Sequence, residues 1–245
     1  MIDDQSLLDY FHRGLIPGPE ESEEAFLKRA ELAKPLGHPE WSEANLPFKI
    51  DWAALTYSNQ KLAWWEGAAT WISEDGLPSI QLRKSFEKGS FLGYKRSEVL
   101  SHEAIHAARM RFEEPHFEEV LAYSTASQAW KRFFGPLFSR TWEPLVLIAA
   151  MALGVFWLWV PLVVVGLSLG WLGYRQWVFK RCCRKLSFSV VVTLTDREMK
   201  RFAKMSEEEI QTILASGSTV LGRLRRLLFK RATISKSEAL RSEHR

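Results

Sequence analysis

An uncharged stretch of 28 residues, 145–172, constrains this chain more than any other feature. Its sequence is LVLIAAMALGVFWLWVPLVVVGLSLGWL. Apolar runs longer than about 18 residues indicate segments that cross a membrane. The alternative is the buried core helix of a soluble domain, which is seldom so long. Aromatic residues near both ends are typical of the belt at the lipid–water interface: Trp142, Trp171, Tyr174 and Trp177.

The length and flanks of this stretch favour a hairpin. One helix would be ~42 Å long against a hydrocarbon thickness of ~30 Å, whereas two helices broken near Pro161 would both be short. Basic residues lie before the run and after it: Lys131, Arg132, Arg140, then Arg175, Lys180, Arg181, Arg184 and Lys185. Because basic flanks stay cytoplasmic, an even number of crossings suits both. We expect a transmembrane hairpin over 143–177, spanning or re-entrant, with one long span as the alternative.

Charge divides the chain into three parts. Residues 1–143 carry 16 Lys and Arg against 22 Asp and Glu, and residues 173–245 carry 17 against 7. These counts predict an acidic region 1–142, the hairpin 143–177 and a basic cytoplasmic region 178–245. The two cysteines, Cys182 and Cys183, are adjacent, which excludes a disulfide framework and a zinc ribbon. The first residues, MIDDQSLLDYF, do not resemble a secretory signal.

Local patterns predict a mixture of helices and strands. Amphipathic helices are expected at 3–13, 20–33, 96–111 and 117–133, and strands at 63–72 and 79–86 joined by a turn at 74–76. Residues 186–194 resemble a third strand, and capping boxes at Thr195/Glu198 and Ser206/Glu209 open two short helices. Residues 219–231 form a basic amphipathic helix that either lies on an anionic membrane or packs on the soluble part.

The motif that indicates chemistry is HEAIH at residues 102–106. On a helix, His102 and His106 lie one turn apart on the same face, so both imidazoles can reach one metal ion, and zinc suits these ligands. Glu103 lies beside them and is expected to take a proton from a zinc-activated water. The motif precedes the apolar run, which argues against an intramembrane protease.

A catalytic zinc site needs a third protein ligand and an open position. Phe112 occupies the position where an extended HExxH motif would carry a third histidine, which excludes that type of site. The remaining candidates are His116, Glu113, Glu114, Glu118 and Glu119. Matching of helix faces favours Glu119, with Glu118 as the alternative.

From Glu119 the chain reads EVLAYSTA, and with HEAIH this resembles the gluzincin class of zinc metallopeptidases, in its compact form. The resemblance covers about residues 94–130 and implies His102, His106 and Glu119 as zinc ligands. It also implies that the small residues Ala122 and Ala126 let two helices approach each other across the metal. The link of twelve residues between His106 and Glu119 is shorter than in large members of the class.

The resemblance further implies that an extended peptide pairs with an edge strand near the metal, and residues 79–86 are the expected edge. A side chain must also stabilise the oxyanion, and the sequence leaves Tyr123, His116, Arg109 and Tyr94 open.

We therefore expect an α+β protein: a zincin-like metalloprotease domain with a transmembrane hairpin inserted before a C-terminal strand–helix region. It would be an integral membrane zinc metallopeptidase that acts on peptide or protein substrates near the bilayer, with its catalytic domain cytoplasmic. Membrane topology explains the basic flanks, so no nucleic-acid partner is expected. The alternatives are a non-enzymatic membrane adaptor with a structural or coincidental HExxH, and hydrolysis of a non-peptide amide.

Overall fold

The computed structural model describes residues 1–64, 66–73, 76–138 and 143–243, with side chains to residue 235. The turn residues 74–75, Arg140 and Trp142 lie outside this part of the chain. The helices are α1 Asp4–His12, α2 Glu23–Leu32, α3 Arg96–Ala108, α4 Pro115–Tyr123, α5 Ala129–Phe134, α6 Glu143–Leu153, α7 Trp159–Lys185, α8 Phe188–Val191, α9 Asp196–Phe202, α10 Glu207–Ser216 and α11 Val220–Glu243. The strands are β1 Ala54–Tyr57, β2 Ala68–Ile72, β3 Pro78–Leu82, β4 Ser90–Phe91 and β5 Tyr94–Lys95, and single 3-10 turns occupy η1 Pro39–Glu43, η2 Lys84–Lys88 and η3 Gly135–Leu137.

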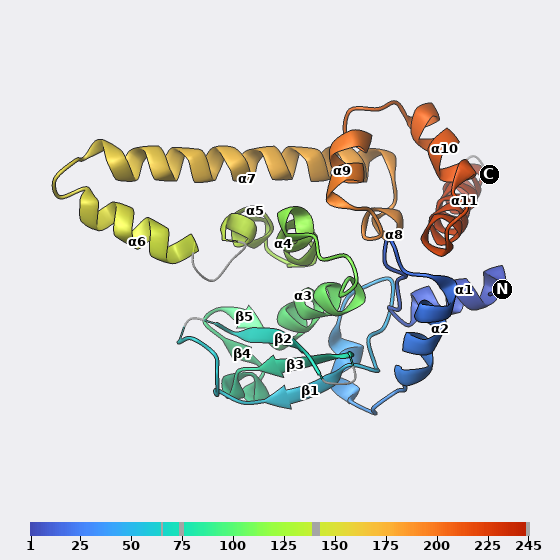
Figure 1. The fold of residues 1–245 in the computed structure, drawn as a ribbon, viewed down its shortest axis with the longest axis horizontal. Coiled ribbons are helices and arrows are strands. Elements are labelled where there is room, and N and C mark those ends of the chain that lie inside the picture. The colour runs from blue at the N-terminus through green and yellow to red at the C-terminus, as the bar shows by residue number, and fades with distance from the viewer. Residues whose placement is uncertain (65, 74–75, 139–142, 244–245) are drawn as a thin grey trace.

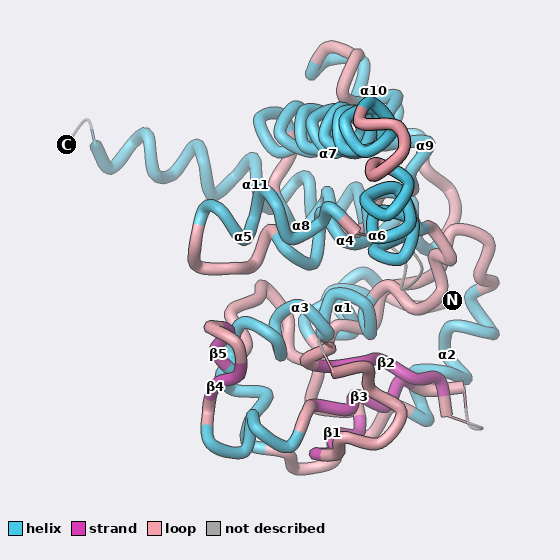
Figure 2. Tube along the Cα trace, turned by 90° about the vertical axis from the view of Figure 1, so that its left-hand side faces the viewer, coloured by secondary structure: helices cyan, strands magenta, loops and turns pink. Residues whose placement is uncertain are grey.

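A small sheet forms one side of the molecule and helices cover it. The strand order is β1-β3-β2, with β1 parallel and β2 antiparallel to β3. Helix α3 lies over the sheet, α4 and α5 lie beyond α3, and α7 runs across them as the outermost layer (Figures 1 and 2). The expected mixed α+β composition is thus confirmed.

The region after the hairpin shares one hydrophobic core with the region before it. The core runs from Leu7 in α1 through Leu100 in α3 to Leu224 in α11. Helix α11 corresponds to the predicted basic helix 219–231 and packs on α1 and α8. In the described part of the chain this favours packing on protein over lying on a membrane. The apolar face of α11 is buried against protein rather than free for lipid.

Several local signals are confirmed. Helix α1 begins at Asp3, whose carboxylate accepts from the Ser6 amide at 2.9 Å. Both predicted capping boxes are present, at the start of α9 and of α10. In each, the side chains of the cap residue and of the glutamate satisfy amides that the helix leaves unpaired.

Four predictions of local structure are wrong. Residues 186–194 contain the short helix α8, because burial of three successive valines at 190–192 in the core overrides their strand propensity. The predicted helix 117–133 is divided into α4 and α5 by residues 124–128. The predicted strand 79–86 ends at Leu82, and it is the central strand. The edge near α3 is therefore β2 and not residues 79–86.

The uncharged stretch folds as two antiparallel helices, α6 and α7, which project from the rest of the molecule (Figure 1). The break falls at residues 154–158 rather than near Pro161. Pro161 is the third residue of α7, where a missing amide costs little, and a Cβ on Gly154 would lie 2.9 Å from its ring. In the described part of the chain, α7 is the helix long and apolar enough to cross a membrane.

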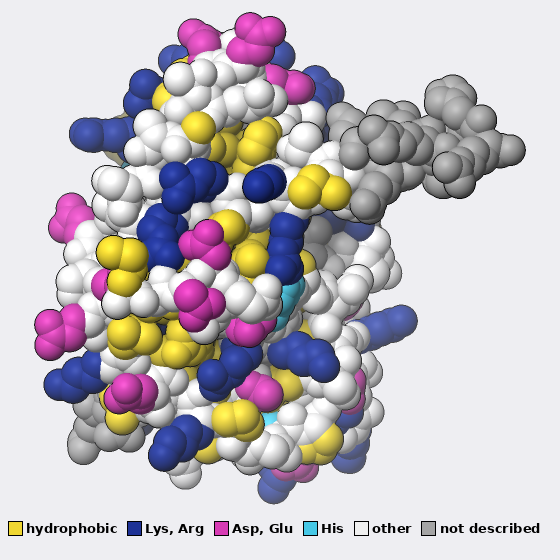
Figure 3. All heavy atoms as spheres, turned by 90° about the vertical axis from the view of Figure 1, so that its right-hand side faces the viewer, with side chains coloured by type: hydrophobic (Ala, Val, Ile, Leu, Met, Phe, Trp, Pro, Cys, Tyr) yellow, Lys and Arg dark blue, Asp and Glu magenta, His cyan; other side chains and the backbone are white. Residues whose placement is uncertain are grey.

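The hairpin and the opposite end of the molecule have different surfaces. Of residues 145–172, only Ala150 and Leu172 are buried. At the opposite end, Lys, Arg, Asp and Glu side chains are interspersed over the surface (Figure 3). Exposed apolar side chains are therefore concentrated on the hairpin.

Candidate metal centre and pocket

The two motif histidines meet on one face of α3. The helix begins after Lys95, whose amide donates to Glu98 at 3.2 Å. One turn further on, His102 Nε2 and His106 Nε2 lie 3.2 Å apart. Both side chains remain partly exposed, at 17% and 20%, so their Nε2 atoms face an accessible space.

Helix α4 brings Glu119 to this pair of histidines. Its Oε2 lies 3.6 Å from His102 Nε2 and its Oε1 lies 3.5 Å from His106 Nε2. Zinc bonds of ~2.0–2.1 Å in a tetrahedron place ligand atoms ~3.3–3.4 Å apart. The three separations are within ~0.3 Å of these edges, with the two histidines approached by different oxygens of Glu119, so His102, His106 and Glu119 could hold one metal ion.

The neighbouring Glu118 has a different role, because it lies behind His106. Its Oε1 is 3.2 Å from His106 Nδ1, and its Oε2 accepts from Arg109 Nε at 3.0 Å. When a carboxylate accepts a hydrogen bond from Nδ1–H of a histidine, the proton stays on Nδ1 and the Nε2 lone pair is free to bind a metal. The geometry therefore separates the two candidate glutamates: Glu119 faces the space between the histidines and Glu118 orients one of them.

The three glutamates around His106 favour a positive charge in this cluster. Burial lowers the pKa of His106, but the hydrogen bond with Glu118 and the charges of Glu119, Glu118 and Glu103 outweigh burial and raise this pKa to about 10. Burial, with the nearby carboxylates, raises the pKa of Glu119 to about 7. Burial also lowers the pKa of His102, which favours its neutral, ligating form. A metal ion would supply the positive charge that a proton on His106 otherwise provides.

Glu103 lies beside this cluster and is held by the edge strand. Thr70 Oγ1 in β2 donates to Glu103 Oε2 at 2.7 Å, and the glutamate is 7% exposed. Burial raises the pKa of Glu103, and the Thr70 hydrogen bond opposes this. A buried carboxylate with a raised pKa is well suited to accept and then release a proton.

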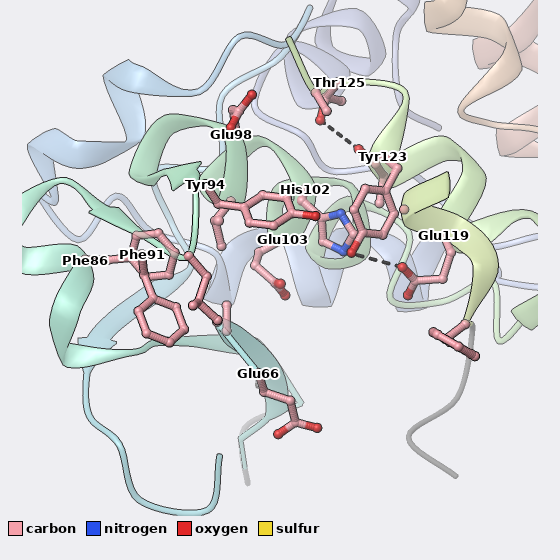
Figure 4. A pocket seen from close by; sticks show the side chains of 18 of the residues that line it. Glu66, Phe86, Phe91, Tyr94, Glu98, His102, Glu103, Glu119, Tyr123 and Thr125 are labelled. Carbon is pink, nitrogen blue, oxygen red and sulfur yellow. Dashed lines mark hydrogen bonds and ion pairs between the residues drawn. The ribbon is translucent and has the colours of Figure 1, made fainter. Parts of the chain in front are cut away.

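A pocket of about 400 Å³ opens in front of these residues (Figure 4). His102, Glu103 and Glu119 lie along one side of it. The remaining lining is largely apolar and comes from η2, β4 and its turn, α4 and the residues after it, the end of η3 and the start of α6: Phe86, Phe91, Leu92, Ala122, Ala126, Phe138 and Pro144 among others. The pocket thus combines a polar side beside the candidate metal centre with an apolar wall.

Two tyrosines lie over the histidines in this pocket. The Tyr123 ring meets the His102 ring edge-on, with centroids 4.5 Å apart, and the hydroxyls of Tyr123 and Tyr94 share a hydrogen bond. Tyr94 is held there by the turn between β4 and β5, where Leu92 and Gly93 both have positive φ angles of 46° and 78°. Such a two-residue turn has the backbone twist of a tight hairpin.

The other residues predicted for the site lie elsewhere. His116 packs on Trp171 with ring centroids 5.7 Å apart, and Glu114 accepts from the Asp196 amide. Neither they nor Glu113 line the pocket. Arg109 is buried behind Glu118 and donates to the Val192 and Leu194 carbonyls at 2.6 and 3.0 Å. Of the four oxyanion candidates, Tyr94 and Tyr123 are the two that line the pocket.

The small residues Ala122 and Ala126 line the pocket beside the candidate metal ligands and are 0% and 7% exposed. Sequence reasoning missed Thr70, which had no motif around it, and the turn at Leu92 and Gly93, whose glycine could have indicated it.

Comparison of the chain with protein families, with curated proteins and with solved structures returned no match. The function of this chain is therefore inferred from the geometry of this site.

Proposed function

We propose that this protein is a membrane-anchored zinc metallopeptidase. The observation that carries the proposal is the set of tetrahedral-sized separations among His102, His106 and Glu119, with Glu103 beside them. Zinc held there would polarise a substrate carbonyl and lower the pKa of a bound water from ~15.7 toward ~7.

Side chains of the protein would transfer the proton, stabilise the oxyanion and orient one metal ligand. Glu103 takes a proton from the attacking water and passes it to the leaving nitrogen, as its raised pKa allows. Tyr123, over the His102 ring, donates a hydrogen bond to the oxygen on which negative charge develops. Glu118 keeps the Nδ1 proton of His106 in place, so that Nε2 remains the ligating atom.

The peptide would lie along β2. Among the described residues, β2 pairs with β3 on one side and its other edge is open to an added strand. Thr70 on this strand donates a hydrogen bond to Glu103. A substrate side chain next to the reacting bond would enter the pocket between Phe91 and Ala122. The apolar hairpin would keep the enzyme at the bilayer, with the basic flanks on the cytoplasmic side.

Metal content and peptidase activity of the detergent-purified full chain test this proposal. We expect about one zinc per chain. His102→Ala and Glu119→Ala should lose zinc, whereas Glu103→Gln should keep it and lose cleavage of a peptide library. His116→Ala is the matched control, because His116 lies outside the pocket, and it should keep both zinc and activity. Unchanged cleavage by Glu103→Gln would refute the proposed mechanism, and absence of zinc from the wild type would refute the metal site.

A further inference from the structure

The exposed part of the hairpin has a defined length. Along α7 the closely spaced series of exposed apolar residues runs from Trp159 to Trp171, and one further exposed ring, Trp177, lies beyond it. The twelve steps of helix from Trp159 to Trp171 rise ~18 Å. Helix α6 has 11 residues, which corresponds to ~16 Å. Both values are well below the ~30 Å of a bilayer's hydrocarbon and close to the thickness of one leaflet.

Below this length, α7 carries a set of aromatic and basic side chains. The rings of Trp171 and Tyr174 are stacked 5.6 Å apart, and those of Tyr174 and Trp177 are 6.4 Å apart. The guanidinium of Arg181 lies 5.4 Å from the centre of the Trp177 ring. Tryptophan and tyrosine followed by basic residues suit the headgroup layer of an anionic membrane.

A second aromatic surface lies at the same level. Trp130, Phe133 and Phe134 of α5 are 56%, 37% and 50% exposed. Gln176 of α7, between Tyr174 and Trp177, donates to the carbonyls of Arg132 and Phe133 at 2.8 and 3.3 Å. These bonds fix α5 beside the aromatic segment of α7, so two separate parts of the chain present exposed aromatic rings at the foot of the hairpin.

We propose that the hairpin enters one leaflet of a lipid bilayer and returns to the same face, with α5 and residues 171–181 in the headgroup layer. This inference rests on the membrane anchoring in the proposed function and adds the depth of insertion and the second contact surface. For the tip of the hairpin to reach the other face of the bilayer, α5 and residues 171–181 would have to leave the headgroup layer. The proposal therefore excludes a full crossing. Because Phe138 and Pro144 line the pocket, the pocket then opens at the membrane surface.

Nitroxide labels on the full chain in phosphatidylcholine–phosphatidylglycerol vesicles test this depth. Cys183→Ser is the background, since Cys182 is fully buried and is therefore expected not to react with the label. Single cysteines would replace Phe156 at the tip, Phe133 in α5, and Leu36 as the matched exposed control far from the hairpin (52% exposed). Collision rates with oxygen, which dissolves in lipid, and with a water-soluble nickel chelate report the depth of each label.

We expect the tip label to collide several-fold less with the chelate than the Leu36 label, and to be protected from chelate on both sides of the vesicle. The Phe133 label should show intermediate protection. A tip label that meets chelate sealed inside the vesicles would overturn the proposal in favour of a full crossing. Chelate access at the tip equal to that at Leu36 would overturn it, because the tip would then lie in water. Protection of the tip from both chelate and oxygen, with crosslinking between chains, would overturn it in favour of a second copy on this surface. Neither result depends on zinc content or cleavage, so failure here is distinct from failure of the catalytic proposal.

Discussion

Replacing Glu118 by glutamine tests whether this residue orients His106 or binds the metal. The carboxylate uses both oxygens: one meets His106 Nδ1 at 3.2 Å and the other accepts from Arg109 Nε at 3.0 Å. Glutamine has one acceptor oxygen, and its amide nitrogen must face one of these two donors. The Glu118→Gln variant therefore loses either the bond to His106 or the bond to Arg109.

The expected size of the effect follows from the position of Glu118 behind a ligand. Loss of such a supporting hydrogen bond typically weakens metal affinity ~10–100-fold, or ~1.4–2.8 kcal/mol. Removal of a ligand itself should cost much more. We therefore expect Glu118→Gln to bind about one zinc with reduced affinity, and Glu119→Gln to retain little zinc under the same conditions.

Competition with a zinc chelator of known affinity measures both variants against the wild type. Glu113→Gln is the control, because Glu113 is an exposed glutamate of the same segment that does not line the pocket. Thermal unfolding of each metal-free variant would show whether the buried Arg109 has lost its partner. The assignment would be refuted if Glu118→Gln lost zinc as completely as Glu119→Gln, or if its zinc affinity equalled that of the wild type.

Three further predictions concern other parts of the site. Thr70→Val should keep zinc and lower kcat/KM about five-fold, because the 2.7 Å bond that orients Glu103 is worth ~1 kcal/mol; unchanged steady-state kinetics would contradict this. Zinc uptake at pH 7 should release between about one and two protons, because the pKa of His106 is about 10 and that of Glu119 about 7 in the metal-free protein. Calorimetry in buffers of different ionisation enthalpy counts the released protons. Zinc uptake without proton release would show that His106 is already neutral. Lys131→Met should destabilise the fold by ~1.5–3 kcal/mol at pH 7, because Lys131 donates to buried Glu98 at 2.8 Å. Burial raises the pKa of Glu98, but hydrogen bonds from Lys131 and Ser127 outweigh burial and lower this pKa to about 2. The difference in unfolding free energy between wild type and Lys131→Met should therefore be complete above pH 4.5 and vanish as the pH falls toward 2. A difference that does not change with pH would contradict this prediction.

Patterns that involve one helix or one turn were readable in advance. The capping boxes at Thr195 and Ser206 and the common face of His102 and His106 all depend on residues within four positions of each other. Backbone geometry sets those relations directly, so they hold in any fold that contains the helix.

Features that depend on distant neighbours were misjudged. Residues 190–192 have strand propensity, yet burial between helices makes them part of a helical turn. Residues 79–86 looked like an edge because they precede the motif helix, but β1 pairs with β3 in parallel and makes it central. The sequence predicts a break near Pro161, whereas the break spans residues 154–158 and Pro161 lies in the first turn of α7.

The amino-acid order alone was sufficient for two properties: a pair of histidines placed so that both could reach one metal ion, with a glutamate between them, and a long apolar stretch whose exposure to water is unfavourable. Both follow from local spacing and from side-chain chemistry. The choice between Glu118 and Glu119 was different in kind. It depends on the rotation of α4 about its axis relative to α3, and contacts far along the chain contribute to this rotation. The Asp196 carboxylate accepts hydrogen bonds from the first amides of α4, and the carbonyls of residues 192 and 194 hold Arg109 behind Glu118. A spacing of one residue turns a helical side chain by about 100°, and the packed core selects which of two adjacent carboxylates faces the histidines.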